Sequence, residues 1–513
     1  MQNIAAVDVG SNAIRMIVGR VDADWKVEHV ENIRIPVRLG QDVFADGFIH
    51  EETIQAAVDA FNRFRSIADA FGVTHLRAIA TSAMREAANG DILVNRIGSS
   101  SNIRIEVISG DDEARLIALA IADVVELQNK RAVLVDIGGG SVEVTVTKGR
   151  NIVYTNSYNM GTVRLLNKLK TKGNLQPISN ETNSAFNLHI HEYAETNRRR
   201  IEQAIGREPV DLCIGTGGNV EEMGKLRQRL FKGSSDKVIT VDELQKLIER
   251  LEQMSYSDRI GKLKLRPDRA DVILPATIMM HMIAKQTGVK EVTIPHVGLK
   301  DGVLLDLAEE LSQVPHPPRR EQVWESAMRL GTKYQFDGEH ASLVCRLAAS
   351  LFRQTKELHK LDEEVLLLLE VASLLHDIGH FINTIDHHKH GHYLLTANRL
   401  IGLTTSQQKI VANLVRYHRK AFPSVDDENF RELSQEDRLL VTKLSALMRL
   451  ADGMDVTHTG RVKGVTIEKA KKGWILHLQG NGDLMFEEWA LMKRRSLFKE
   501  VFGISLEIRA QKE

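Results

Sequence analysis

The chain has 513 residues, and its 68 basic side chains balance its 68 acidic ones. It is 43% hydrophobic and 27% charged, which is typical of a globular protein, and its length predicts two to four domains. A zero net charge excludes a global positive field. We therefore expect no nucleic-acid partner, and we expect any polyanion to bind at a local site.

The sequence also predicts the compartment. Its first residues lack the pattern of a secretory signal, and no apolar run reaches the ~18 residues that span a bilayer. The longest candidate, residues 365–382, carries charged residues and predicts a buried helix. Cys213 and Cys345 lie in apolar surroundings and are expected to be buried free thiols. These features predict a cytoplasmic protein without an integral membrane segment.

Strands and helices alternate over residues 1 to about 125. Two apolar stretches around a Gly-bearing turn predict a hairpin, and a long amphipathic stretch predicts a helix. A strand that runs into a turn, a second strand and a helix that starts with acids follow. In chain order these segments are 4–10, 13–21, 51–72, 75–84, 103–110 and 111–126.

The same pattern restarts near residue 130. Residues 131–150 repeat the opening hairpin, and aligning the two Asp residues brings Arg15 to the position of Glu143. Residues 210–226 predict a strand, a Gly-rich turn and a helix, and residues 291–307 predict a strand, a loop and a helix. We therefore expect two similar α/β domains, over 1–125 and 126–312.

The second half has a different composition. Residues 313–322 hold three of the ten prolines and predict a linker. Residues 320–460 are expected to form a helical domain. The segment 461–513 is expected to form a small α+β domain with a hairpin, a helix and a last strand. The predicted fold class is thus α/β, followed by an all-α domain and an α+β tail.

Three Gly-rich turns suggest a phosphate site. Glycines let backbone N–H groups converge on an anion, and an Asp at the preceding strand end can hold a cation or its water. A single turn of this kind is often an ordinary hairpin turn, but here the Asp–Gly motif occurs twice at equivalent positions. The expected loops are Asp8 with Gly10, Ser11 and Asn12; Asp136 with Gly138, Gly139, Gly140 and Ser141; and Gly215 with Gly217 and Gly218.

These motifs resemble the superfamily of sugar kinases, heat-shock protein 70 and actin, and most closely its exopolyphosphatase and guanosine pentaphosphate phosphatase family. Residues 7–18 and 135–144 are similar to the two phosphate motifs of that family. The stretches 80–90, 108–116 and 265–276 are similar to three further family segments. The resemblance covers roughly residues 4–310 and implies two RNase H-like, actin-like domains around a phosphate cleft.

The resemblance also implies roles for single residues. Glu113 matches the general base that activates water, and Arg85 matches a phosphate-contacting arginine. Arg15 lies in the first phosphate loop. Asp136 and Glu143 match positions associated with Mg²⁺, and Asp8, at the end of the first strand, is a further candidate ligand of that ion. The sequence departs from the family at Ala13, at GTGGN (215–219) and at His296–Val297, which bears on substrate preference.

Histidines are dense in the second half. Their order, with an adjacent His–Asp pair, resembles the HD superfamily of metal-dependent phosphohydrolases. This resemblance implies a metal site of Mn, Fe or Zn at His340, His376, Asp377 and Asp452, and a second metal at His390 and His418. The alternative is a structural helical domain whose histidines line a phosphate-binding groove or the surface.

The leading functional hypothesis is a Mg²⁺-dependent exopolyphosphatase that removes terminal phosphates from inorganic polyphosphate. The second is hydrolysis of the 5′ γ-phosphate of pppGpp at the same site. A third is a regulator that binds polyphosphate or an alarmone such as ppGpp with little turnover, and an actin-like kinase or ATPase is a fourth. The resemblance also implies a homodimer.

Overall fold

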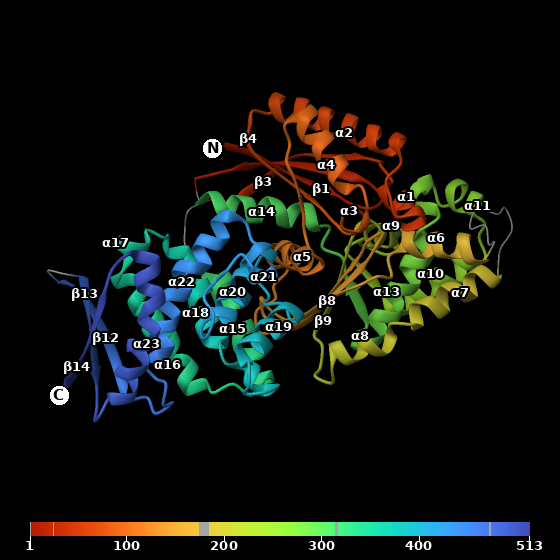
Figure 1. The fold of residues 1–513 in the computed structure, drawn as a ribbon. Coiled ribbons are helices and arrows are strands. Elements are labelled where there is room, and N and C mark those ends of the chain that lie inside the picture. Colours follow the sequence, from red (N-terminus) through yellow and green to blue (C-terminus); the bar gives the residue numbers. More distant parts are fainter. Residues whose placement is uncertain (1, 24, 174–183, 313–316, 471–472, 513) are drawn as a thin grey trace. The chain divides into compact units, whose positions relative to one another are not determined.

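The computed structural model describes residues 2–23, 25–173, 184–312, 317–470 and 473–512. These fall into two compact units, Met1–Pro315 and His316–Glu513 (Figure 1). Two clusters of buried hydrophobic side chains lie in the first unit and a third lies in the second unit. Each unit therefore has its own core.

The first unit holds two sheets with the same topology. In the first sheet the order is β3-β2-β1-β4-β5, with β1, β2 and β3 antiparallel and β1, β4 and β5 parallel. The second sheet has the order β10-β11-β9-β6-β7-β8 with the same directions from β8 through β11, and β10 is added antiparallel at its edge. The sequence repeat is thus a structural repeat. The strands are β1 Gln2–Val9, β2 Ile14–Val21, β3 Val27–Ile35, β4 Val73–Ala80, β5 Ile105–Val107, β6 Arg131–Ile137, β7 Val142–Lys148, β8 Asn151–Tyr158, β9 Leu212–Thr216, β10 Val238–Thr240 and β11 Glu291–Thr293.

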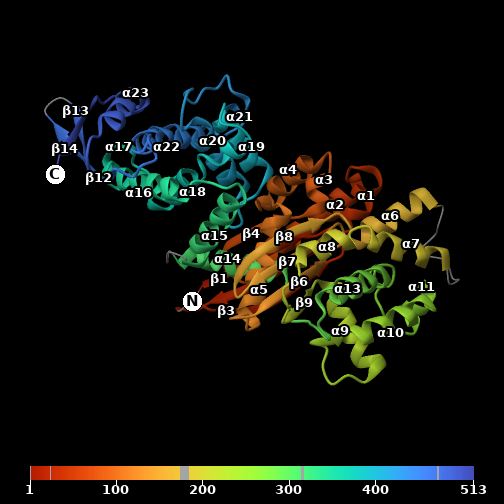
Figure 2. The ribbon, with the colours of Figure 1, turned by 90° about the horizontal axis from the view of Figure 1, so that it is seen from below.

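Helices follow the parallel strands of both sheets, as crossover connections require. Around the second sheet, α13 packs against both α9 and α10 (Figure 2). The helices of this unit are α1 Leu39–Asp46, α2 Glu51–Ala70, α3 Ser82–Glu86, α4 Gly90–Ser101, α5 Gly110–Val124, α6 Thr162–Gly173, α7 Ser184–Glu195, α8 Arg198–Ile205, α9 Gly218–Phe231, α10 Val241–Glu252, α11 Tyr256–Gly261, α12 Pro267–Ala270, α13 Ile273–Thr287 and α14 Leu299–Ser312.

The helix α14 follows the second sheet in the chain but packs on α5 and β1 of the first half. The two helices lie so close that a side chain at Gly302 would collide with the carbonyl of Leu116. Asp306 accepts hydrogen bonds from Arg115 (Nη1 to Oδ1, 2.8 Å) and from Arg77 (Nη1 to Oδ2, 2.7 Å). Burial opposes ionisation, but Arg115 and then Arg77 lower the pKa of Asp306 to about 2. The contact between α14 and α5 is therefore tight and charge-paired.

The second unit is helical up to residue 453. A Pro at the first turn of α15 is compatible with a helix because its missing N–H would be unpaired there. The part of the predicted linker from Pro317 onward is thus helical, and residues 313–316 lie outside the described residues. The helices are α15 Pro317–Lys333, α16 Gly338–Gln354, α17 Lys356–His359, α18 Leu366–Leu375, α19 His387–Ala397, α20 Thr405–Tyr417, α21 Glu428–Arg431 and α22 Gln435–Gly453, with 3₁₀ turns η1 Glu363–Val365 and η2 Ile378–Phe381.

The predicted helix over 365–382 is not continuous. α18 ends at Leu375, and η2 starts at Ile378, so His376 and Asp377 lie at the break. After the break η2 packs closely on α19, and a side chain at Gly379 would collide with the carbonyl of His387. The chain turns at this point so that η2 can pack on α19.

The tail has the predicted hairpin, helix and strand. β12 Val462–Ala470 pairs antiparallel with β13 Gly473–Gly480, and β14 Leu506–Lys512 pairs parallel with β13. The helix α23 Met485–Phe502 makes the crossover that a parallel pair needs. Both cysteines are buried free thiols, as expected. In the described parts of the chain, no helix has the length and apolar character that a membrane crossing needs.

Candidate active site

A cavity in the first unit is lined by residues of both repeats. The two Gly-rich loops face each other across it, because a side chain at Gly139 would lie 3.1 Å from the Cβ of Ser11. The third loop closes the cavity at the start of α9. The lining residues are Asp8, Gly10, Ser11, Asn12, Ala13, Arg15, Arg34, Thr81, Ser82, Glu113, Asp136, Ile137, Gly138, Gly139, Ser141, Thr162, Gly217, Gly218, Asn219, Glu221, Arg269, Gly298, Leu299 and Lys300.

The repeat places different charges at equivalent positions. In the first hairpin Asp8 is opposite Arg15, and in the second Asp136 is opposite Glu143. Arg15 Nη1 lies 3.9 Å from Asp8 Oδ2. Burial, opposed by Arg15, raises the pKa of Asp8 to about 6. The first hairpin therefore places a carboxylate opposite a guanidinium group, and the second places two carboxylates opposite each other.

Two buried carboxylates and the half-buried Asp136 meet on the side of the second hairpin. One oxygen each of Glu113, Asp136 and Glu143 lies within 4.8 Å of the others. Thr216 donates to Asp136 (2.6 Å), and Ser157 donates to one oxygen of Glu143 (2.7 Å). The other oxygen of Glu143 has no partner. An unpaired buried oxygen within a carboxylate cluster fits a divalent cation, because oxygen donors suit Mg²⁺.

Burial raises the pKa values of all three carboxylates, and repulsion within the cluster adds to this for Glu113 and Glu143. Burial and then Asp136 raise the pKa of Glu143 to about 7. Burial, offset by Thr216, raises the pKa of Asp136. Burial and then Glu143 raise the pKa of Glu113 well above its ordinary value, and Arg85 opposes both. Because of these raised pKa values, the carboxylates carry less negative charge when no cation is bound than when one is bound.

Glu113 lies in the first turn of α5, which is fixed by its cap. The Ser109 hydroxyl accepts from the N–H of Asp112 (3.1 Å) and donates to its carboxylate (2.6 Å). Arg85 Nη1 donates to Glu113 (3.2 Å) and to the carbonyl of Ile108 (2.8 Å). Glu113 is thus a buried carboxylate with a fixed position and an elevated pKa, which are the properties of a general base.

Several basic residues line the same cavity as the carboxylates. Of these, only Arg15 was predicted from the sequence. Arg269 is buried and donates to Asn219 Oδ1 (2.8 Å). Burial, and then the charges of Arg15 and Arg34, lower the pKa of Arg269 to about 10. Three guanidinium groups that repel one another beside a cavity indicate an anion site. The sequence signal for Arg269 was its place in the family-like segment 265–276.

Lys300 also lines the cavity and was not predicted. Its Nζ lies 2.9 Å from Asp301 Oδ2. The sequence predicted a Gly-bearing loop within residues 291–307. Its composition gave no indication that Lys300 binds a ligand.

Four predicted site residues do not line the cavity. Gly140 accepts from Arg164 Nε (2.7 Å) through its carbonyl, and a side chain at Gly215 would meet Val220 and Met280. These two glycines serve packing. Arg85 and Glu143 lie behind the lining and act on Glu113: Arg85 pairs with it, and the charge of Glu143 raises its pKa.

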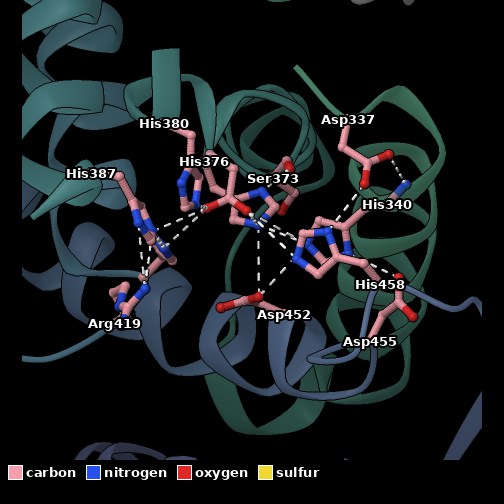
Figure 3. A network of polar contacts seen from close by, with 12 residues as sticks. Asp337, His340, Ser373, His376, His380, His387, Arg419, Asp452, Asp455 and His458 are labelled. Atoms are coloured by element: carbon pink, nitrogen blue, oxygen red, sulfur yellow. Dashed lines mark hydrogen bonds and ion pairs between the residues drawn. The ribbon is translucent and has the colours of Figure 1, made fainter. Parts of the chain in front are cut away.

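In the second unit, the predicted His340, His376 and Asp452 come together (Figure 3), and Asp377 lies 3.5 Å from His376 and 3.9 Å from His340. Asp377 also meets His387 and His418. His390 is not in this cluster. His387, three residues earlier, takes the position expected for it, because α19 begins at His387 and buries its first turn. His458, also absent from our predictions, stacks on His340 with ring centroids 3.6 Å apart.

Comparisons with known proteins agree with this architecture. The model of the Ppx/GppA phosphatase family matches residues 17–311, and that of the Ppx/GppA phosphatase domain III matches residues 324–496. The chain is 25% identical over 452 residues to a guanosine-5′-triphosphate,3′-diphosphate pyrophosphatase of Photobacterium profundum, covering 87% of this chain and 85% of the relative. A protein of the same name from Aliivibrio fischeri is 26% identical, with 86% of each chain covered.

Two solved structures resemble the first unit. An exopolyphosphatase from Cytophaga hutchinsonii superposes with a TM-score of 0.56 at 25% identity and covers 60% of this chain and 98% of its own. A Ppx/GppA protein from Aquifex aeolicus superposes with a TM-score of 0.51 at 22% identity, covering 61% and 99%. The second likeness supports the fold alone, which is the predicted actin-like one.

Proposed function

The chain belongs to the Ppx/GppA phosphatase family and is a phosphoanhydride hydrolase, and from this premise we propose that it removes the terminal phosphate from inorganic polyphosphate. The observation that carries the proposal is the composition of the cavity. The cavity is lined by glycines of all three loops, by Arg15, Arg34 and Arg269, and by the carboxylate of Glu113. Within the described residues, no aromatic side chain lines the cavity, so it offers no stacking surface for a base.

The protein groups have separate tasks in this mechanism. Ser11, Asn12, Arg15 and the glycines of the facing loops bind the terminal phosphate, and Arg269 neutralises its charge. Glu113 accepts a proton from water as the water oxygen attacks the terminal phosphorus. The bond to the bridging oxygen breaks, and the shortened chain leaves with that oxygen. Phosphoryl transfer of this kind depends mainly on positioning and charge neutralisation.

The family requires a divalent metal, and we propose Mg²⁺ at Asp136 and Glu143, with Asp8 across the cavity. The unpaired oxygen of Glu143 and the raised pKa values fit such an ion. When bound, the cation supplies charge neutralisation for the phosphate oxygens. Without it, repulsion keeps part of the cluster protonated, which lowers the supply of ionised Glu113.

A second candidate is hydrolysis of the 5′ γ-phosphate of pppGpp. The observation that favours it is the name of the curated relatives, which cover the chain almost from end to end. The terminal phosphate of pppGpp would bind at the same site, and its nucleoside would lie outside the described cavity. A regulator that binds either ligand without turnover is disfavoured, because Glu113 is held in place by Arg85 and by a capped helix.

The test is phosphate release, with MgCl₂, from long-chain polyphosphate and from pppGpp under matched conditions. A higher kcat/KM on polyphosphate is expected. A preference for pppGpp would make the second candidate the function, and binding of either ligand without release would support a regulator. Arg269→Lys is a useful companion, since loss of the planar guanidinium should raise the KM for the preferred substrate.

A further inference from the structure

We propose that Arg164, in the first turn of α6, is a positioning residue for the hydrolytic reaction. It fixes the second phosphate loop, residues 138–141, against α3, the helix whose Arg85 holds Glu113. Arg164 does not line the cavity, so it acts on the substrate through the loop and through α3. This inference rests on the hydrolysis proposed above, and it holds for either of the two substrates.

The guanidinium group of Arg164 is buried, and each of its three nitrogens donates a hydrogen bond. Nε donates to the carbonyl of Gly140 (2.7 Å), and Nη1 and Nη2 donate to the two oxygens of Glu86 (2.8 Å and 2.5 Å). We call this pair of bonds to Glu86 the fork. Cζ lies over the ring of Phe44, 4.2 Å from its centroid. Gly140 belongs to the second repeat, whereas Glu86 and Phe44 belong to α3 and α1 of the first, so one side chain joins the two repeats.

The backbone of α6 holds the same loop. Three successive loop carbonyls accept N–H groups from the start of α6 and from the residue before it. The pairs are Gly138 with Thr162 (3.2 Å), Gly139 with Val163 and Arg164 (2.9 Å and 3.1 Å), and Gly140 with Gly161 (3.2 Å). Because the carbonyl and the N–H of a trans peptide point in opposite directions, the N–H groups of Gly139, Gly140 and Ser141 point away from α6. These are the donors that the loop offers to a phosphate.

The short helix α3 contacts the loop, the base and Arg164. A side chain at Gly140 would lie 2.3 Å from the hydroxyl oxygen of Ser82, the first residue of α3. Arg85 donates to Glu113 (3.2 Å), and Glu86, the last residue of α3, accepts the fork. The fork therefore links the loop that binds the phosphate to the carboxylate that accepts the proton from water. A misplacement on the order of 1 Å between such groups can cost roughly 10²-fold in rate.

The next turn of α6 is linked to the first phosphate loop. Asn167 Nδ2 donates to the carbonyl of Gln41 (3.0 Å) at the start of α1. In the same turn of α1, the N–H of Gly40 donates to the carbonyl of Ser11 (2.8 Å). The helix α6 thus contacts the second loop directly and the first loop through α1. Arg164 is the charged residue at the centre of this arrangement.

The kinetic test compares the full-length protein with Arg164→Lys, Glu86→Gln and the double variant, with MgCl₂ and the substrate that the parent prefers. Lys keeps the charge but cannot form the planar fork. We expect each single variant to lower kcat roughly 10- to 100-fold while KM changes less than about threefold. The double variant should lose no more than Arg164→Lys alone, because both changes break one fork. Losses that multiply in the double variant would overturn the proposal, and so would a raised KM at unchanged kcat.

Arg38→Gln is the matched control. Arg38 Nη2 donates to Asp271 Oδ2 (2.8 Å), so this ion pair also joins the two repeats, but neither residue lines the cavity. This variant should keep kcat within about twofold of the parent, and its effect should multiply with that of Glu86→Gln. If Arg38→Gln lowers kcat as much as Glu86→Gln does, any contact between the repeats has this effect and the role of Arg164 is wrong.

Hydrogen exchange followed by mass spectrometry gives a readout that does not depend on activity. The N–H groups of residues 161–164 donate to loop carbonyls, so their exchange rates report whether α6 holds the loop. We expect exchange there to be about tenfold faster in Glu86→Gln and to keep the parent rate in Arg38→Gln. Unchanged exchange in Glu86→Gln would overturn the proposal. A parent that releases phosphate from neither substrate would instead refute the proposed function, and the exchange rates would still decide whether the fork holds the loop.

Discussion

At the scale of single residues, the clearest dependence is that of hydrolysis on Glu113. Glu113→Gln keeps the size of the side chain and its contact with Arg85 but cannot accept a proton. We expect kcat to fall roughly 10²- to 10⁴-fold while substrate binding is kept. Equilibrium binding of polyphosphate beside single-turnover release checks this. Lost binding with normal turnover of the complex would refute the assignment of Glu113 as the base.

Arg85 controls the pH at which this base works. Burial and Glu143 raise the pKa of Glu113, and Arg85 lowers it. A base acts only when it is deprotonated, so activity is lost as pH falls through its pKa. Arg85→Gln removes the opposing charge, and we expect the acid limb of kcat/KM to move to higher pH. A lower rate with an unmoved limb would mean that Arg85 acts on the phosphate and not on Glu113.

Glu143 links metal binding to stability. Its pKa is about 7 in the fold and near 4.5 when unfolded, so the fold binds more protons between these values. The free energy of unfolding without metal therefore decreases as pH rises through that window, by roughly 3 kcal/mol. Glu143→Gln should be more stable than wild type at pH 8 without metal and gain nothing from MgCl₂. Thermal unfolding measures both, with the exposed Glu52→Gln as control; identical Mg²⁺ responses would contradict the site.

At the scale of elements, the start of α5 determines where the base lies. Ser109→Ala removes the cap and should lower stability by about 1 kcal/mol and reduce kcat. Ser255→Ala removes the equivalent cap from α11, none of whose residues line the cavity. It should have a similar stability cost without the loss of kcat. Urea unfolding and steady-state rates of both variants check this. Equal kcat values would show that the cap does not position Glu113.

Elements with strong local patterns were predictable from sequence. The two hairpins, the strand–turn–helix units and the tail all follow from apolar periodicity and glycine placement, and the alignment of Arg15 with Glu143 is confirmed by strand register. A repeated motif carries information about pairing that a single motif lacks.

Other features depend on contacts that periodicity does not encode. The six residues HHKHGH offer four histidines, and only the start of α19 decides that His387 and not His390 turns toward Asp377. Arg34 and Arg269 reach the cavity from elements far apart in sequence, and no local pattern marks Arg34. The close approach of Gly379 to α19, after the helix break at His376, is another contact of this kind.

At the scale of the whole molecule, the separate cores predict separate unfolding. No described hydrophobic cluster spans both units, so calorimetry should show two transitions instead of one. Ligands stabilise the unit that binds them. Mg²⁺ should raise the midpoint temperature of one transition, and Glu143→Gln should abolish this shift. Mn²⁺ should raise the midpoint temperature of the other transition, and Asp377→Asn should abolish that shift. A single transition that both variants affect alike would contradict this independence.

The return of α14 to the first half has a consequence for synthesis on the ribosome. Residues 1–125 emerge early, but the helix that carries Glu113 lacks its partner until residues 299–312 have been made. Until then Arg77 and Arg115 lack Asp306, and the groove that receives Gly302 is open. The nascent chain therefore cannot complete the candidate active-site cavity, which Gly298, Leu299 and Lys300 help to line, before the end of the first unit has left the exit tunnel.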